Sequence, residues 1–139
     1  GLPQETFDGI REQLEDDRPK FLAGFAKTFY GVHLFSQPVS DEFLQRDLIL
    51  TLNSAGYATL KAMRAWSTTD FRNDLATIKV PLLVLHGKAD ETVPIDASAE
   101  ETIKLVPHAQ YIVYDDAPHG LFYTHKNKFN EDIISFVNS

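Results

Sequence analysis

The stretch "VPLLVLHG", residues 80–87, decides the fold class of this chain. It is an unbroken apolar run of strand length between Pro81 and Gly87, which is typical of a strand buried on both faces of a parallel sheet. A polar loop follows, then a helical segment over residues 95–106, a second apolar strand over residues 109–114 and a terminal helix. This alternation of strands and helices predicts an α/β fold with a parallel sheet.

The first half of the chain shows helical patterns and no strand. We expect its helices within residues 4–14, 18–31, 41–55, 57–68 and 68–78. Ser40 is the predicted N-cap of the third helix, and Gly31 is the predicted stop of the second. Phe21, Phe25 and Phe29 recur every four residues along one face of the second helix, a spacing that most often indicates plain core.

Composition limits the classes of partner. The 139 residues are 43% hydrophobic and 24% charged, which indicates one globular domain. The formal net charge of −7 makes nucleic acid and anionic membranes unfavourable partners. There is no cysteine, so disulfides and thiolate chemistry are excluded, and we expect a reducing, cytoplasmic location. The acidic N-terminus does not have the pattern of a signal peptide.

Two loops carry the candidate catalytic residues. Functional side chains of an open parallel sheet collect beyond the carboxyl ends of its strands, where "HGKADETVP" carries Asp90 and "DDAPHG" carries His119. Because adjacent parallel strands bring these loops side by side, we expect the carboxylate of Asp90 to accept a hydrogen bond from His119 and so to orient the imidazole. Asp followed by His is also the order that closes the Ser, Asp, His triad of α/β-hydrolases.

Other acids and histidines of the chain are weaker candidates than these two. Asp115 and Asp116 compete with Asp90 because they lie close to His119 in the sequence, but we expect them to shape the turn by bonding their own backbone. His86 precedes a glycine at a strand end and is predicted to be structural. The spacing of the other histidines is not that of metal ligands, so we expect no metal at His33, His108 and His125.

The two loop motifs carry a family resemblance. "VPLLVLHGKADETVPIDAS" together with "YIVYDDAPHGLFYTHKNKFNEDIISFV" resembles the C-terminal part of an α/β-hydrolase. The similarity is closest to the cofactor-free bacterial haloperoxidases, a group that includes aryl esterases and perhydrolases, because its "HGxxDxxVP" and "APHG" motifs are both intact here. The resemblance implies a helical cap over residues 1–69, the last two strands and helices of the core over residues 70–139, and no cofactor.

The chain lacks the family's nucleophile motif, a G-x-S-x-G turn between a strand and a helix. Ser54 comes nearest but lies late in a helical pattern with no strand before it, and Ser98 lies inside the helix expected over residues 95–106. The resemblance therefore implies a separate N-terminal segment that carries the serine nucleophile and the oxyanion hole. Without this partner the sheet is incomplete, because two parallel strands leave edges and faces uncovered.

The expected function is that of a serine hydrolase, a carboxylesterase or aryl esterase, with Asp90 and His119 as triad acid and base. The resemblance adds perhydrolysis, in which hydrogen peroxide replaces water, and small ester or carboxylic acid substrates. We also expect a homo-oligomer. The acyl pocket is expected at Ile10, Phe25, Phe29, Thr92, Val93 and Leu121.

Three alternatives stay open at this point. The chain can be a non-catalytic interaction fragment that keeps the triad loops as a relic. It can instead belong to the dehalogenases or epoxide hydrolases, which share the Asp and the His but use an aspartate nucleophile. A lactonase or lactamase is the third alternative. The segment that carries the nucleophile decides among them.

Overall fold

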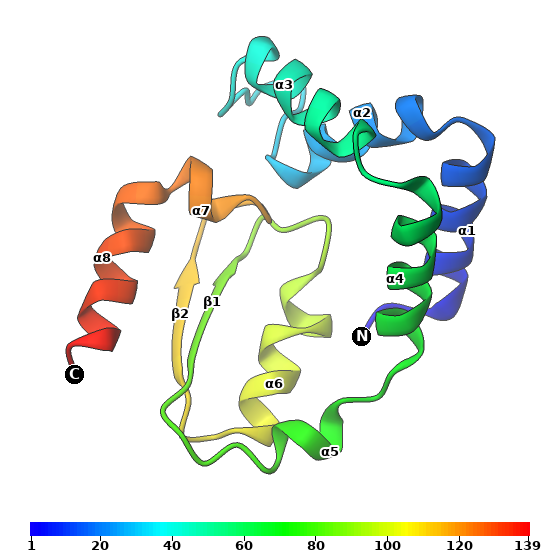
Figure 1. Cartoon of the computed structure of the whole chain (residues 1–139). Coiled ribbons are helices and arrows are strands. Elements are labelled where there is room, and N and C mark those ends of the chain that lie inside the picture. The colour runs from blue at the N-terminus through cyan, green and yellow to red at the C-terminus, as the bar shows by residue number, and fades with distance from the viewer.

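The computed structural model describes residues 1–139 and divides into a helical half and a half that contains the strands (Figure 1). The helical half consists of α1 (Gln4–Asp16), α2 (Arg18–Phe29), α3 (Asp41–Leu52) and α4 (Gly56–Thr68). The second half consists of α5 (Arg72–Leu75), β1 (Leu83–Gly87), the 3₁₀ turn η1 (Ile95–Ala97), α6 (Ala99–Leu105), β2 (Gln110–Tyr114), α7 (Leu121–Thr124) and α8 (Lys126–Val137). None of these helices is both long and apolar enough to cross a membrane.

The two strands form a parallel pair, as the sequence predicts. Their register joins Leu83 to Gln110 at one end and Gly87 to Tyr114 at the other, so both strands finish at the same edge. α6 lies on one side of the pair and α8 on the other (Figure 1). The connection through α6 makes the parallel direction possible, because a parallel pair needs a long crossover.

The expectation that β1 is buried on both faces is wrong within this chain. Only Gly87 is buried, and the other residues of the strand are half-buried. The physical reason is that the sheet has two strands, so one edge of β1 and part of its faces have no covering layer. The apolar run predicted the strand correctly but overestimated its burial.

The helix expected over residues 95–106 is interrupted at Ser98, which lies between η1 and α6 instead of inside a helix. Its φ of −138° and ψ of −83° are not helical. Its hydroxyl donates to the carbonyl of Pro94 at 2.8 Å, a local bond that competes with helix formation. The carbonyl of Ser98 accepts from the N–H of Thr102 at 3.0 Å, so α6 begins after this residue.

Two predicted helix boundaries are confirmed. The hydroxyl of Ser40 accepts a hydrogen bond from the N–H of Phe43 at 3.1 Å and so caps α3. Gly31 follows α2 with a φ of 71°, a conformation that a side chain would disfavour. The turn between these points lets α2 and α3 pack around a buried cluster of Ala26, Tyr30, Val39 and Leu44.

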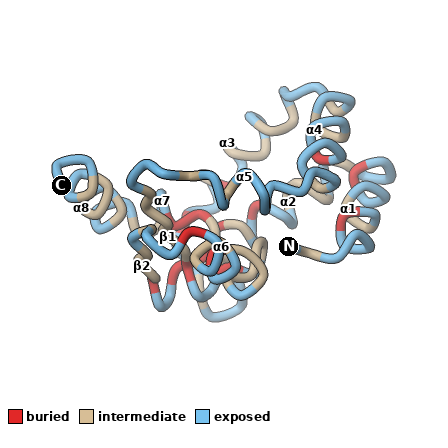
Figure 2. Tube along the Cα trace, turned by 90° about the horizontal axis from the view of Figure 1, so that it is seen from below, coloured by how far each residue is buried: buried red, intermediate tan, exposed pale blue.

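The two halves of the chain meet at the loop after β2. The N–H of Gly120 donates to the carbonyl of Phe29 at 2.7 Å, and a Cβ on Gly120 would lie 2.4 Å from the ring of Tyr30. Figure 2 shows buried residues gathered around the strands and α6, with further ones where α1 and α4 lie together. The end of α2 is therefore packed directly against the loop that carries His119.

Candidate active site

The loops after β1 and β2 lie against each other. The N–H of Ala89 donates across them to the carbonyl of Ala117 at 3.1 Å. A Cβ on Gly87 would lie 2.0 Å from that carbonyl oxygen, so the approach requires glycine at this position. The contact brings the Asp90 loop and the His119 loop side by side, which agrees with the expectation for adjacent parallel strands.

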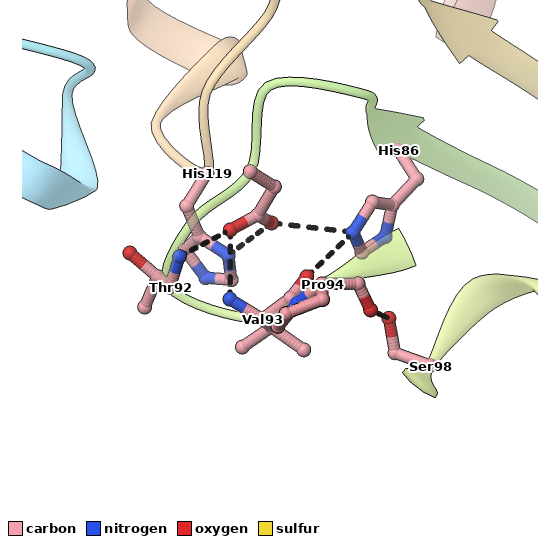
Figure 3. Close-up of polar contacts among 7 residues, drawn as sticks. His86, Thr92, Val93, Pro94, Ser98 and His119 are labelled. Carbon is pink, nitrogen blue, oxygen red and sulfur yellow. Dashed lines mark hydrogen bonds and ion pairs between the residues drawn. The ribbon is translucent and has the colours of Figure 1, made fainter. Parts of the chain in front are cut away.

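Asp90 is the single buried charged residue of the chain, and both of its carboxylate oxygens are bonded (Figure 3). Oδ1 accepts from the N–H groups of Thr92 at 2.9 Å and Val93 at 2.8 Å. Oδ2 accepts from Nδ1 of His119 at 2.7 Å. Burial alone would raise the pKa of Asp90, but the hydrogen bonds from His119 and Val93 outweigh burial. The ring of His86 acts in the same direction, so the pKa of this carboxyl lies below its usual value.

His119 is oriented by two neighbours and leaves one nitrogen open. Its side chain is 34% exposed, and the Phe29 ring packs against it edge to face with the ring centroids 4.7 Å apart. Because the ionised carboxylate of Asp90 can only accept, Nδ1 of His119 carries the hydrogen of their bond. Nε2 has no hydrogen-bond partner within the chain. An imidazole held in this way can take up a proton at Nε2.

His86 is also a member of this cluster, and the sequence did not indicate its contact with the acid. Its Nε2 lies 2.9 Å from the carbonyl oxygen of Val93 and 3.2 Å from Oδ2 of Asp90 (Figure 3). The available signals were its position at the end of β1, four residues before the acid, and its place as the first residue of the "HGxxDxxVP" motif. That position is compatible with many structural roles, so the contact with Asp90 could be found only from the structure.

The two competing acids do not reach His119. Asp115 pairs with Lys88 at 2.5 Å, and Asp116 lies 3.2 Å from Nε2 of His125. Their side chains are 84% and 88% exposed. The expectation that they bond their own backbone is wrong, because each carboxylate finds a cationic or ring nitrogen partner on a neighbouring segment instead.

No serine hydroxyl of the chain forms a hydrogen bond with His119. The hydroxyl of Ser54, between α3 and α4, accepts from Arg18 at 2.8 Å and donates to the carbonyl of Thr51 at 2.7 Å. The hydroxyl of Ser98 is bonded within the turn before α6. Neither serine is positioned to exchange a proton with His119.

The histidines outside the cluster have separate contacts. His125 bonds the hydroxyl of Thr124 through Nδ1 at 2.8 Å, and Nε2 of His108 lies 3.3 Å from the carbonyl of Val80. His33 pairs through its backbone with Ser36. The structure contains no group of three or more His, Cys, Asp or Glu side chains that could hold a metal ion.

An apolar cavity of about 440 Å³ opens between α1, α2, α4 and the loop after β1. It brings together most of the residues expected in the acyl pocket, namely Ile10, Phe25, Thr92 and Val93. The other two do not line it. Leu121 is buried beside Tyr114 and Ala117, and Phe29 packs against His119. Residues that the sequence did not indicate complete the apolar wall, among them Phe7, Leu14, Met63 and Trp66.

The phenylalanine stripe of α2 connects this cavity to the candidate base. Its ring centroids lie 5.8 Å apart between Phe21 and Phe25 and 5.9 Å apart between Phe25 and Phe29. Phe21 and Phe25 line the cavity, whereas Phe29 touches His119. The stripe is therefore not plain core, because two of its rings line the cavity and the third contacts the imidazole.

Comparison with known proteins shows the family. The family described as the alpha/beta hydrolase fold matches residues 2–126. The chain is 36% identical to a non-heme haloperoxidase of Rhodococcus erythropolis, over all of this chain and 51% of that protein. It is 33% identical to a bifunctional esterase/perhydrolase of Acinetobacter calcoaceticus, with the same coverage of 100% and 51%. A bromoperoxidase from Bacillus anthracis has a similar structure, with a TM-score of 0.94 and 31% identity over all of this chain and 50% of that one.

The chain belongs to the α/β-hydrolase fold family. It spans about half the length of the curated relatives it matches, 50% in one case and 51% in another. The predicted fold class, a C-terminal portion of an α/β-hydrolase, is confirmed, and so is the resemblance to the non-heme haloperoxidases.

Proposed function

We propose that this chain supplies the acid and the base of a serine hydrolase that acts on esters. The observation that carries the proposal is the 2.7 Å hydrogen bond from Nδ1 of His119 to the buried carboxylate of Asp90. The bond holds the hydrogen on Nδ1 and leaves Nε2 free to take a proton from a nucleophile. The similarity to a bifunctional esterase/perhydrolase supports an ester as the substrate class.

In the proposed reaction a serine of an N-terminal segment attacks the ester carbonyl carbon, and its proton passes to Nε2 of His119. His119 gives that proton to the alcohol as the alcohol leaves, and the acyl group stays on the serine. Water then attacks the acyl group, loses a proton to Nε2, and releases the carboxylic acid while the serine oxygen regains the proton. Asp90 stays ionised and stabilises the imidazolium in both halves of the reaction.

Perhydrolysis is proposed as a side activity of the same site. Hydrogen peroxide would replace water in the second half, and the acyl group would leave as a peracid without any cofactor. Two relatives support this assignment by their names, a non-heme haloperoxidase and a bifunctional esterase/perhydrolase. The acyl–serine intermediate is common to both outcomes, so His119 and Asp90 keep the same roles.

We assign residues 1–69 to a helical cap and residues 70–139 to the C-terminal part of the core. The grouping of α1–α4 apart from the strands supports this division. The apolar cavity is the proposed acyl pocket for a small ester or carboxylic acid, because Thr92 both lines it and donates its N–H to Asp90. Phe29 would flank the reacting carbonyl through its contact with His119.

An N-terminal segment is the proposed essential partner, since it would supply the serine, the oxyanion donors and further strands beside β1. A homo-oligomer is also proposed, supported by the exposed apolar side chains of Leu34 and Phe35, which are 86% and 90% exposed. The absence of cysteine supports a cytoplasmic location.

A fluorophosphonate probe tests the proposal on the complete enzyme, because it reacts with an activated serine. We expect one labelled serine in the N-terminal segment, with labelling lost in His119→Ala and kept in His125→Ala. Turnover in H₂¹⁸O that places ¹⁸O in an aspartate, without serine labelling, would indicate the aspartate nucleophile of a dehalogenase or epoxide hydrolase. Turnover of lactones or lactams but not of open-chain esters would indicate a lactonase or lactamase. No turnover of any of these substrates would indicate a non-catalytic fragment.

A further inference from the structure

His86 lies where a rigid element meets the loop of the acid. It is the fourth residue of β1, where it pairs with Val113 of β2, and its side chain is 13% exposed. Its ring points from the end of the strand toward the Asp90 loop (Figure 3). A single ring nitrogen, Nε2, lies 2.9 Å from the carbonyl oxygen of Val93 and 3.2 Å from Oδ2 of Asp90.

The hydrogen on this nitrogen can be assigned from its two neighbours. A carbonyl oxygen accepts only, and the carboxylate of Asp90 accepts only because its pKa lies below the usual value, through bonds that outweigh the opposing effect of burial. Nε2 of His86 therefore carries a hydrogen, whichever state Nδ1 is in. This one N–H donates to the carbonyl of Val93 in the acid's own loop, and its nitrogen also lies 3.2 Å from Oδ2 of Asp90.

Val93 is held from both sides by these contacts. Its N–H donates to Oδ1 of Asp90 at 2.8 Å, and its carbonyl accepts from His86. The acid, the loop backbone and the strand are thus connected by two hydrogen bonds, and the 3.2 Å contact between Nε2 of His86 and Oδ2 of Asp90 closes the ring. Oδ2, the oxygen nearest to His86, is the same oxygen that receives Nδ1 of His119. Rotation of the carboxylate would break contacts on both of its oxygens.

We propose that His86 is a positioning residue, whose Nε2–H holds the carboxylate of Asp90 and the loop backbone in the orientation that His119 requires. The inference rests on the proposed function, since it assigns a role in the same acid–base pair. His86 does not meet the substrate or exchange a proton with it. A partner of this kind, one step removed from the reacting atoms, controls the direction of the acid–base hydrogen bond and so the rate of the chemical step.

The test uses ester hydrolysis by the complete enzyme with variants at His86. Phe keeps a ring but removes the donor, Gln places an amide N–H near the position of Nε2, and Asn carries the same amide one carbon too short. We expect His86→Phe and His86→Asn to lower kcat about 10- to 100-fold with little change in KM, and His86→Gln to restore most of the loss. The low-field NMR signal of the His119 Nδ1 proton should move in the Phe and Asn variants and return in the Gln variant.

Asp90→Asn separates failure of this inference from failure of the proposed function, because it should lower kcat by about 10⁴ if the acid–base pair is catalytic. An unchanged kcat in Asp90→Asn would reject the proposed function itself. A large loss in Asp90→Asn with wild-type kcat in His86→Phe would overturn the role of His86. Equal losses for Gln and Asn would also overturn it, since the ring would then only fill space. If the Phe variant does not fold, the Gln and Asn pair still decides the question.

Discussion

At the scale of single residues, the site depends on one buried carboxylate that is fully paired. A buried charge is costly unless hydrogen bonds compensate for its lost solvation. Asp90 has such bonds on both oxygens, two from backbone N–H groups and one from His119, with His86 close by. The partners of Asp90 come from its own loop, from β1 and from the loop after β2, so its orientation is determined by several elements at once.

Replacing His119 by Ala should lower kcat for ester hydrolysis by about four orders of magnitude or more, because acid, base and nucleophile act as a unit. His125 provides the matched control. It contacts Thr124 and the exposed Asp116 instead of Asp90. His125→Ala should therefore change kcat little. Steady-state kinetics with an aryl acetate on the complete enzyme measure both, and comparable losses would mean that the base has been misassigned.

At the scale of elements, the site lies where β1 and β2 end and where α2 and α8 pack against their loops. Gly87 and Gly120 permit the two closest approaches, to the carbonyl of Ala117 and to the ring of Tyr30. Tyr114, the last residue of β2, joins α8 through a hydrogen bond from its hydroxyl to Asp132. The helices therefore hold the ends of the strands, and with them the loops of the candidate acid and base.

Tyr114→Phe tests the connection between β2 and α8. Burial and the neighbouring Asp132 raise the pKa of Tyr114, so its contribution to stability is complete below about pH 10 and is lost as the pH rises through the folded value. The hydrogen bond from Lys128 lowers the pKa of Asp132, and the hydrogen bond from Tyr114 acts in the same direction with a smaller effect. The carboxylate of Asp132 therefore stabilises the fold above about pH 4, and this stabilisation is lost as the pH falls. The bond stabilises the fold between these limits.

The expected loss in the free energy of unfolding is about 1–2 kcal/mol at pH 7, and it should shrink at pH 11 and at pH 3. Urea denaturation of the complete enzyme, followed by circular dichroism, measures it. Tyr57, which is 74% exposed and has no hydrogen bond from its hydroxyl, is the control, and Tyr57→Phe should have little effect at any pH. A loss of the same size at all three pH values would contradict the assigned hydrogen bond.

Phe25→Ala tests the apolar cavity between the helices and the acid loop. The ring of Phe25 lines the cavity and does not contact the Asp90–His119 pair, so its removal enlarges the space without breaking that hydrogen bond. We expect kcat/KM for butyrate esters to rise about tenfold relative to acetate esters. Phe71→Ala is the control, because Phe71 is 53% exposed and lies outside the cavity. An unchanged preference in Phe25→Ala would place the acyl group elsewhere.

At the scale of the whole molecule, the chain exposes apolar surface that a covering segment would bury. β1 is only half-buried, and large apolar side chains are exposed on several elements, among them Ile49, Val80 and Val137. A parallel pair of strands has little stability without neighbours. Together with the lack of a serine hydroxyl hydrogen-bonded to His119, this agrees with a site that needs residues from another segment.

The chain expressed alone should show no turnover of a simple aryl ester and should unfold at low denaturant concentration. The physical reasons are the half-covered sheet and the absence of a serine hydroxyl bonded to His119. Co-expression with the N-terminal segment should restore both activity and a cooperative transition. Turnover by the 139-residue chain without a partner would refute the proposed division of the site.

The sequence by itself determined the α/β class, the two strands and the N-cap of α3, and it selected Asp90 and His119 as the candidate acid and base. These features have local causes, because an apolar run, an N-cap serine and two turn motifs act over a few neighbouring residues. Strand order and parallel direction then followed from the length of the connection through α6. The burial of β1 could not be predicted in this way, since it depends on which other layers cover the strands.

Only the tertiary structure decided which further side chains meet Asp90 and His119 at the site. His86 contacts the acid because β1 ends beside its own loop, and Asp115 and Asp116 pair with Lys88 and His125 because their carboxylates point outward. Phe25 and Phe29 have different roles because they lie on successive turns of α2, where Phe25 lines the cavity and Phe29 contacts the imidazole of His119. Each of these contacts joins segments distant in sequence or depends on the direction of a side chain, and no local pattern of residues carries that information.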